Sequence, residues 1–202
     1  MKLVIMTRPT FFVEEDKIIS AMFDEGLDSL HLCKPGASPI YSERLLTLLH
    51  EECYGKITVH GHFYLKDEYR LRGIHIDDSS TQAPAGYKGH LSRTCRNLDE
   101  LKEIKKKSDY VFLRNVFDCI TDSAEKASFA MPQLKEASRR GLIDKKVYAL
   151  GGIDIDHIRT AKELGFGGVV VCGDLWGRFD IHNELDYRSL IAHFEKLRKA
   201  AN

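Results

Sequence analysis

Eight short apolar segments alternate along the chain with segments of helical periodicity, and this alternation constrains the fold more than any other feature. The apolar segments, which we predict as strands, are residues 3–6, 29–32, 56–59, 73–76, 89–92, 110–113, 147–150 and 168–171. Strands that alternate with helices form a parallel sheet covered by those helices. Strands of only about four residues fit a closed barrel better than an open sheet. The first strand also lacks the G-x-G-x-x-G motif of an open dinucleotide-binding sheet.

The helical segments complete this pattern with one omission. They are residues 13–25, 42–50, 64–70, 98–105, 132–140, 155–164 and 187–200. We expect the leucines of the second segment, Leu48 among them, to lie inside. Residues 77–88 contain Ser, Pro and Gly without helical periodicity, so the fourth helix is predicted to be missing. The chain is therefore predicted to be an α/β protein, a single-domain (β/α)8 TIM barrel over residues 1–202.

Composition narrows the classes of partner. The chain has 30 basic and 30 acidic residues and no formal net charge, which argues against nucleic acid or an anionic membrane as a partner. No apolar run approaches the roughly 20 residues of a membrane span, and residues 1–8 turn polar too soon for a signal peptide. We expect a cytoplasmic protein whose five cysteines, an odd number without C-x-x-C, are free thiols. A homodimer is compatible with the sequence, which does not determine the oligomeric state.

Glycines end the last two predicted strands. Gly151 and Gly152 follow the seventh strand, and Cys172 and Gly173 follow the eighth. Glycine lets the backbone approach a ligand closely, and backbone N–H groups at such turns suit a phosphate dianion. TIM barrels often bind phosphate after these two strands. We therefore predict a phosphate site here, the alternative being a tight strand-to-helix turn.

Four blocks of the chain carry a resemblance to a known family. The blocks are His31-Leu32-Cys33-Lys34, His60 with Gly73-Ile74-His75, Thr94-Cys95-Arg96-Asn97-Leu98-Asp99-Glu100, and Asp109-Tyr110-Val111 with Phe117-Asp118-Cys119-Ile120-Thr121. Together with the Gly-Gly-Ile strand end, they resemble the thiamine phosphate synthase and thiazole tautomerase superfamily. The corresponding family patterns are Gln-Leu-Arg-x-Lys, Asn-Asp with Gly-Val-His, Ser-x-His-Ser-Leu-Glu-Glu, and Asp-Tyr with Phe-x-Thr-x-Thr-Lys. No block is specific alone, but their order and spacing together indicate the family.

The resemblance implies a reaction of thiamine biosynthesis, in which an aminopyrimidine diphosphate is joined to a thiazole phosphate and pyrophosphate is released. It also implies Mg²⁺ as a cofactor, and phosphorylated thiazole and aminopyrimidine molecules as partners. Such a reaction needs positive charge on the leaving pyrophosphate, a pocket that orients the pyrimidine, and a phosphate cradle. The implied site residues are Lys34 and Thr121 (catalytic), His31, His60 and Thr94 (substrate contacts), and Gly151, Gly152, Cys172 and Gly173 (phosphate cradle).

Several family residues are replaced in this chain. Cys33 stands at a pyrophosphate-binding arginine, and Asp122 stands at a pyrophosphate-binding lysine. Gly61 and Ser80 stand at the two metal-binding aspartates. A carboxylate in place of a lysine inverts the charge beside an anion. The resemblance therefore implies a synthase site that is eroded around the diphosphate and the metal.

Two groups of residues offer partial replacements. Asp77 and Asp78 lie near Ser80 and are candidate metal ligands, because Mg²⁺ needs few protein oxygens. Arg96 stands where the tautomerase branch has an acid/base histidine, but arginine does not exchange protons near neutral pH. The alternative functions are consequently a tautomerase-like enzyme acting on a thiazole phosphate carboxylate, or a non-catalytic sensor or carrier of a thiamine-related phosphate.

Cysteines and histidines also gather at the predicted strand ends. They are Cys33, Cys95, Cys119, Cys172, His60 and His62. Thiol and imidazole groups are typical ligands of a soft metal such as zinc. The alternative, which we favour at this stage, is a coincidence of small residues around a pocket. Likewise we interpret His60 as a hydrogen-bonded histidine of the barrel rim, and His75 as a structural residue within its strand.

Overall fold

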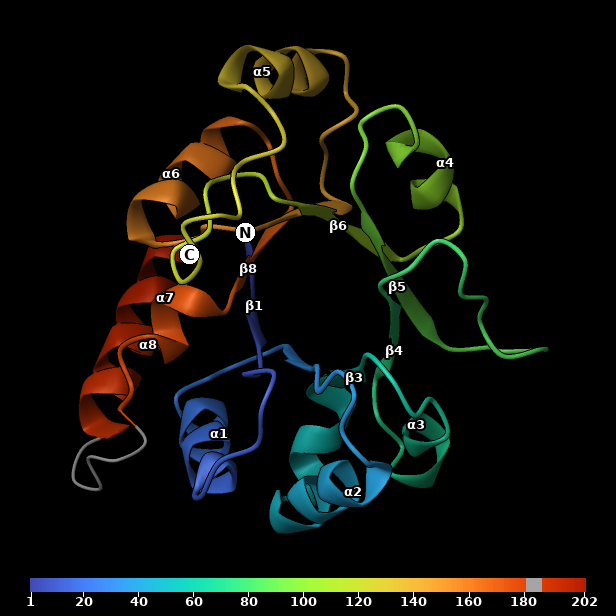
Figure 1. Cartoon of the computed structure of the whole chain (residues 1–202), viewed down its shortest axis with the longest axis vertical. Helices are drawn as coiled ribbons and strands as arrows, with labels where there is room; N and C mark the ends of the chain where they lie inside the picture. Colours follow the sequence, from blue (N-terminus) through green and yellow to red (C-terminus); the bar gives the residue numbers. More distant parts are fainter. Residues whose placement is uncertain (181–186) are drawn as a thin grey trace.

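All eight predicted strands form, and they pair in chain order into a closed parallel barrel in which β1 also pairs with β8 (Figure 1). The computed structural model describes residues 1–180 and 187–202. The strands are β1 (Lys2–Met6), β2 (Leu30–Leu32), β3 (Ile57–Val59), β4 (Gly73–Ile76), β5 (His90–Cys95), β6 (Tyr110–Arg114), β7 (Val147–Leu150) and β8 (Gly168–Val171). The predicted TIM barrel is therefore confirmed.

Helices surround this barrel (Figure 1). They are α1 (Glu15–Asp24), α2 (Pro39–Leu48), the 3-10 helix η1 (Glu51–Lys56), α3 (Leu65–Glu68), α4 (Leu101–Lys106), α5 (Met131–Arg139), α6 (Ile155–Glu163), α7 (Gly173–Trp176) and α8 (Tyr187–Ala201). Residues 77–89, all described, contain no helix, as predicted. None of the described helices is long and apolar enough to cross a membrane.

Two local predictions differ from the structure. Leu48 is 55% exposed rather than inside, because Leu45 and Leu49, one helical turn apart, point to the core and Leu48 falls outside that face. Helix α7 was not predicted, since four residues are too few to show a helical period. It is anchored by Trp176, whose Nε1 donates to the Met6 carbonyl oxygen at 2.7 Å.

The inside of the barrel is polar on one side and apolar on the other. His31 of β2 lies 4.7 Å from Phe112 of β6, measured between ring centroids, although these strands are not neighbours. Both side chains therefore point into the barrel. Strands β2 to β5 contribute the buried polar residues His31, Thr58, His75, Ser92 and Thr94. The apolar side is formed by Val4, Phe112 and Val170, with Met6 and Leu150 packed against them.

Candidate functional site

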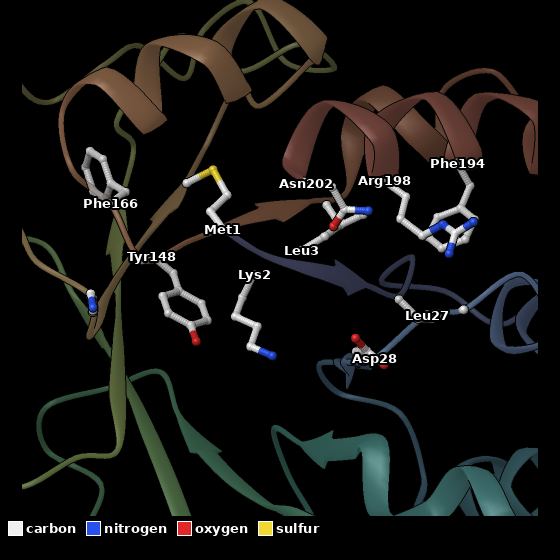
Figure 2. A pocket seen from close by; sticks show the side chains of 13 residues that line it. Met1, Lys2, Leu3, Leu27, Asp28, Tyr148, Phe166, Phe194, Arg198 and Asn202 are labelled. Carbon is white, nitrogen blue, oxygen red and sulfur yellow. The ribbon is translucent and has the colours of Figure 1, made fainter.

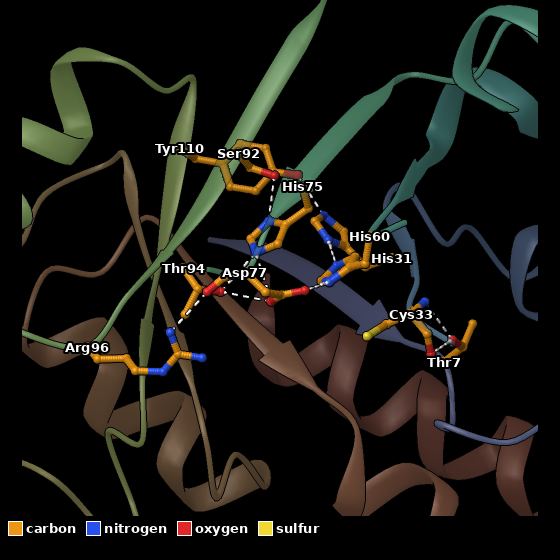
Figure 3. Close-up of polar contacts among 10 residues, drawn as sticks. All are labelled: Thr7, His31, Cys33, His60, His75, Asp77, Ser92, Thr94, Arg96 and Tyr110. Carbon is orange, nitrogen blue, oxygen red and sulfur yellow. Dashed lines mark hydrogen bonds and ion pairs between the residues drawn. The ribbon is translucent and has the colours of Figure 1, made fainter. Parts of the chain in front are cut away.

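Three histidines, His31 of β2, His75 of β4 and His60 directly after β3, form one hydrogen-bonded group on the polar side of the barrel (Figure 3). His31 Nδ1 lies 2.8 Å from His60 Nε2, and His31 Nε2 lies 2.6 Å from the Tyr110 hydroxyl. His75 bonds through its two nitrogens to Ser92 and to a threonine of β5. The rings of His60 and His75 are stacked with centroids 4.2 Å apart. Burial obliges these ring nitrogens to find partners inside the protein, and they do.

Asp77 joins this group to the mouth of the barrel. Its Oδ2 lies 2.7 Å from His60 Nδ1, and its Oδ1 accepts from the Thr94 hydroxyl at 3.1 Å (Figure 3). His75 Nε2 lies 3.4 Å from the same Oδ1. The Asp77 side chain is 40% exposed, whereas the His60 side chain is 3% exposed. Asp77 is thus the accessible end of a buried polar chain.

The environment separates the pKa values of these groups. Burial lowers the pKa of His60, but hydrogen bonds with Asp77 and Cys33 outweigh burial and raise it to about 9. Burial lowers the pKa of His75 to about 3, and burial followed by the nearby His60 charge lowers that of His31 well below its usual value. Burial tends to raise the pKa of Asp77, but its bonds to His60 and His75 bring it well below the usual range. The site therefore holds a protonated His60 against an ionised Asp77 near neutral pH.

Cys33 lies directly beside this pair. Its backbone is clamped to Thr7, whose hydroxyl accepts from the Cys33 N–H at 3.0 Å and lies 3.1 Å from the Cys33 carbonyl oxygen. The Sγ of Cys33, a ring nitrogen of His60 and a carboxylate oxygen of Asp77 all lie within 4.8 Å of one another. Among the five free cysteines, Cys33 alone shares such a described cluster with a histidine and a carboxylate. His60 is thus hydrogen-bonded as expected, but its side chain is buried below the rim.

The opposite side of the mouth is built from backbone. Gly151 and Gly152 follow β7 with φ angles of 106° and 64°, which favour glycine. Gly173 follows β8, and a Cβ added there would lie 3.0 Å from Cγ2 of Thr121. The structure thus brings together Thr121, which the resemblance implies is catalytic, and Gly173, which it places in the phosphate cradle. The Cys172 thiol donates to the Thr7 carbonyl oxygen, and burial raises its pKa to about 11.

Packing also explains the two glycines after β7. A Cβ on Gly152 would lie 2.2 Å from the Asp118 carbonyl oxygen, and one on Gly151 would lie 2.8 Å from the Asn115 Cα. Both glycines therefore allow the loop after β6 to pack against the end of β7. Phosphate binding at Gly151 and Gly152 stays a prediction, and a larger residue at either position would disturb this loop directly.

Lys34 has an internal partner that the sequence does not reveal. Its Nζ lies 2.5 Å from Glu15 Oε1 and donates to the Thr10 carbonyl oxygen at 3.0 Å. Each side chain of the ion pair is 2% exposed, and the ammonium group lies over the Phe11 ring. This argues against Lys34 as a free cation for diphosphate, and the side chain is not solvated either. The positive charge of Lys34 instead neutralises the buried carboxylate of Glu15.

The other predicted residues lie on or after β2, β4 and β5, some at the mouth and one inside the barrel. Thr94 and Asp77 meet at the mouth. Both ring nitrogens of His31 are hydrogen-bonded inside the barrel, one to His60 and one to Tyr110. Any influence of His31 on a ligand therefore passes through His60. Asp78 is exposed and accepts from the Ser80 N–H at 2.8 Å, outside the described histidine and cysteine clusters. Arg96 donates to the Asp77 carbonyl oxygen at 3.0 Å, which places its guanidinium at the rim.

Cavities open at both ends of the barrel. One of about 330 Å³ lies between the ends of β2 and β3 and is lined by Cys33, Lys34, His60, His62 and Asp77, among others. A larger one, about 670 Å³, lies at the other end, around Lys2, Asp28, Tyr148 and Arg198 (Figure 2). Active sites of TIM barrels lie at the carboxyl ends of the strands. The smaller cavity is therefore the candidate functional site.

The residues at this mouth do not fit Mg²⁺, which prefers oxygen ligands in octahedral geometry. Gly61 and Ser80 supply no carboxylate. The two carboxylate oxygens of Asp77 are hydrogen-bonded to His60 and Thr94. The Asp78 carboxylate accepts from the Ser80 N–H within its own turn. The donors that cluster with Asp77 are sulfur and nitrogen.

Comparison with known proteins identifies the family. No protein-family model and no curated protein matches this sequence. Among solved structures, the chain is 47% identical to a thiamine phosphate pyrophosphorylase from Bacteroides thetaiotaomicron, with a TM-score of 0.90 over 100% of this chain and 98% of that one. The chain belongs to the thiamine phosphate pyrophosphorylase family. This confirms the resemblance to the thiamine phosphate synthase superfamily.

More distant structures share the fold alone. A thiamine phosphate pyrophosphorylase from Pyrococcus furiosus is 18% identical, with a TM-score of 0.76 over 99% of this chain and 95% of that one. A 3-hexulose-6-phosphate synthase is 14% identical, with a TM-score of 0.63 over 100% of both chains. The barrel is thus shared by chains of low sequence identity.

Proposed function

We propose that this member of the pyrophosphorylase family binds a thiazole phosphate at the ends of β7 and β8, and that it joins this molecule to an aminopyrimidine diphosphate at a reduced rate. The observation that carries the proposal is the 47% identity, over the whole chain, to a thiamine phosphate pyrophosphorylase. In the reaction a carbon–nitrogen bond to the thiazole forms, a carbon–oxygen bond breaks, and pyrophosphate leaves. The contact between Thr121 and Gly173 supports the phosphate side of this proposal.

The reduced rate follows from the electrostatics of the leaving group. Pyrophosphate gains charge in the transition state and needs cations to stabilise it. Cys33 and Asp122 stand where the family pattern has cations, and the Lys34 ammonium is already paired with Glu15. The chain therefore supplies little positive charge to the departing group.

A turnover assay tests the proposal. The full chain is given both substrates and Mg²⁺, thiamine phosphate is measured, and the pyrophosphorylase from Pyrococcus furiosus serves as a positive control. We expect binding of thiazole phosphate by calorimetry together with slow product formation. Binding without any turnover would instead indicate a sensor or carrier. Absence of thiazole phosphate binding would exclude the proposed function.

A second function, tautomerase-like proton transfer on a thiazole phosphate carboxylate, is favoured by one observation. Asp77 is accessible and is hydrogen-bonded to the buried His60, whose pKa is raised to about 9 after burial is outweighed by its bonds to Asp77 and Cys33. This pair offers acid/base groups that Arg96 cannot offer. Isomerisation of the carboxylate, followed by NMR, should be lost in Asp77→Asn. Equal rates in both proteins would exclude this function.

A further inference from the structure

Three residues that lie around the eroded metal region converge on one point. Cys33, His60 and Asp77 follow β2, β3 and β4, which are consecutive strands of the barrel. Their sulfur, nitrogen and oxygen atoms lie within 4.8 Å of one another (Figure 3). Two of the three, Cys33 and His60, replace the arginine and asparagine of the family pattern. The replaced residues, together with Asp77, thus assemble a different set of donors.

This set suits a zinc-class ion. Thiolate, imidazole and carboxylate are the ligands of zinc, at about 2.3 Å for sulfur and about 2.0–2.2 Å for nitrogen and oxygen. In a tetrahedral site, bond lengths of this kind place ligand atoms roughly 3.3–3.8 Å apart. His60 Nδ1 and Asp77 Oδ2 are now 2.7 Å apart, so they would separate by less than about 1 Å. Asp77 is 40% exposed and has room for this movement.

Hydrogen-bond partners behind the candidate ligands already orient them. With His60 Nδ1 facing the site, its Nε2 faces His31 Nδ1 at 2.8 Å, and His31 in turn faces the Tyr110 hydroxyl at 2.6 Å. The other oxygen of Asp77, Oδ1, accepts from the Thr94 hydroxyl. Metal-binding histidines usually have such a partner on the second nitrogen, which sets the tautomer and the ring orientation. A solvated cluster of coincidental residues does not require this support.

We propose that Cys33, His60 and Asp77 bind a divalent transition metal of the zinc class at the carboxyl ends of β2, β3 and β4. The cavity of about 330 Å³ that the three residues line gives an entry path and leaves a coordination position for water or a ligand. Three protein ligands with an open position are typical of catalytic rather than structural zinc sites. The proposal goes beyond the synthase reaction and holds whether or not that reaction occurs.

Cobalt titration tests the site without an activity assay. The full chain is treated with chelator and titrated with Co²⁺, because a thiolate ligand gives Co²⁺ an intense sulfur-to-metal absorption in the near ultraviolet. We expect this band to saturate at one metal per chain, to disappear on addition of Zn²⁺, and to persist in a large excess of Mg²⁺. A band absent from the wild-type protein, or displaced by Mg²⁺, would overturn the proposal.

Variants assign the ligands. Cys33→Ser should remove the band, whereas the matched control Cys119→Ser, a half-buried cysteine on the other side of the mouth, should keep it. Asp77→Asn should weaken Co²⁺ binding by at least about tenfold. His31→Asn should weaken it by about 10–100-fold while retaining the band at saturation, as expected of a positioning residue. Circular dichroism verifies that each variant is folded. An unchanged band in a folded Cys33→Ser protein would contradict the assignment.

Discussion

The two sides of the barrel mouth differ in the material from which they are built. At the ends of β7 and β8 the candidate site is made of backbone, with Gly151, Gly152 and Gly173 allowing close approaches. At the ends of β2, β3 and β4 it is made of side chains, and the central pair is His60 with Asp77. The resemblance predicts that the backbone side keeps the family pattern and that the side-chain side departs from it.

This difference shows why substitutions should affect the two sides unequally. A backbone cradle depends on the path of the chain, so it tolerates changes of side chain. A side-chain site changes its chemistry with each residue that changes. The polar interior contributed by β2 to β5 gives the second site a hydrogen-bonded foundation, which the apolar opposite side lacks.

The largest expected effect comes from returning the side-chain side to the family pattern. The triple variant Cys33→Arg, His60→Asn, Gly61→Asp restores a cation for pyrophosphate and a carboxylate for Mg²⁺. A Cβ at Gly61 meets nothing within 4 Å, so the aspartate has space. Each charged contact to a phosphoryl group is worth on the order of a hundredfold in rate, so we expect synthase turnover to rise by at least about a hundredfold.

Steady-state turnover with Mg²⁺ and both substrates measures this rise, and Gly61→Asp alone is the control, since it adds the carboxylate without the cation. A wild-type turnover of about 1 per second or more would show that the replaced residues were not needed. No gain in a folded triple variant would mean that the two sides of the mouth do not act on the same substrates.

The buried ion pair should govern stability rather than catalysis. Lys34→Met leaves Glu15 buried and unpaired, which should cost about 3–5 kcal/mol in the free energy of unfolding. The double variant Lys34→Met, Glu15→Leu should recover most of this loss. Urea denaturation measures both, with Lys106→Met, from an exposed pair, as a control worth less than about 1 kcal/mol. If Lys34 is a catalytic cation, the stable double variant will lose synthase turnover; we expect it to keep the wild-type rate.

The backbone side is probed best through Thr121. Thr121→Val removes one hydroxyl beside Gly173 and keeps the shape of the side chain. We expect the affinity for thiazole phosphate to fall by about tenfold, roughly 1.4 kcal/mol, in calorimetric titration. Thr47→Val, which removes an exposed hydroxyl on α2, should leave the affinity unchanged. Equal affinities in the wild type and Thr121→Val would place the phosphate away from Thr121.

The barrel itself could be predicted because its signals are local. Alternating apolar and helical segments predicted all eight strands, and the lack of periodicity after β4 correctly predicted the missing helix. The two glycines after β7 were predicted as a strand end. Their packing against Asn115 and Asp118, however, depends on a loop 30 residues or more earlier in the chain, which no local pattern reveals.

The side-chain site could be predicted only in part. Cys33 and His60 were predicted to lie at strand ends. The sequence does not reveal that Asp77 contacts His60 through one carboxylate oxygen while Thr94, on the neighbouring strand, binds the other. Lys34 pairs with Glu15, which lies on α1 and carries no sequence signal of that contact. Such pairings depend on the register of neighbouring strands and on helix placement, so they become visible only in three dimensions.

The smallest expected effect concerns Asp122, which lies next to Thr121 on the loop after β6. It is exposed and accepts from the Ala124 N–H at 2.9 Å, so its charge is partly screened by water. Asp122→Lys exchanges a repulsive charge for an attractive one beside the predicted phosphate region. We expect diphosphate affinity to rise by about tenfold, roughly 1.4 kcal/mol, at low ionic strength, and the gain to shrink at high salt.

Calorimetric titration with the aminopyrimidine diphosphate measures this gain. Asp24→Lys makes the same charge change at the end of α1, close to Gly26 and Leu27 of the cavity at the opposite end of the barrel, and should leave the affinity unaltered. A gain in both variants would indicate a non-specific effect of net charge. No gain in Asp122→Lys would mean that this loop holds its carboxylate away from the diphosphate. The replacement of the family lysine would then explain none of the reduced rate. The difference between the two sides of the mouth would rest on Cys33, His60 and Gly61 alone.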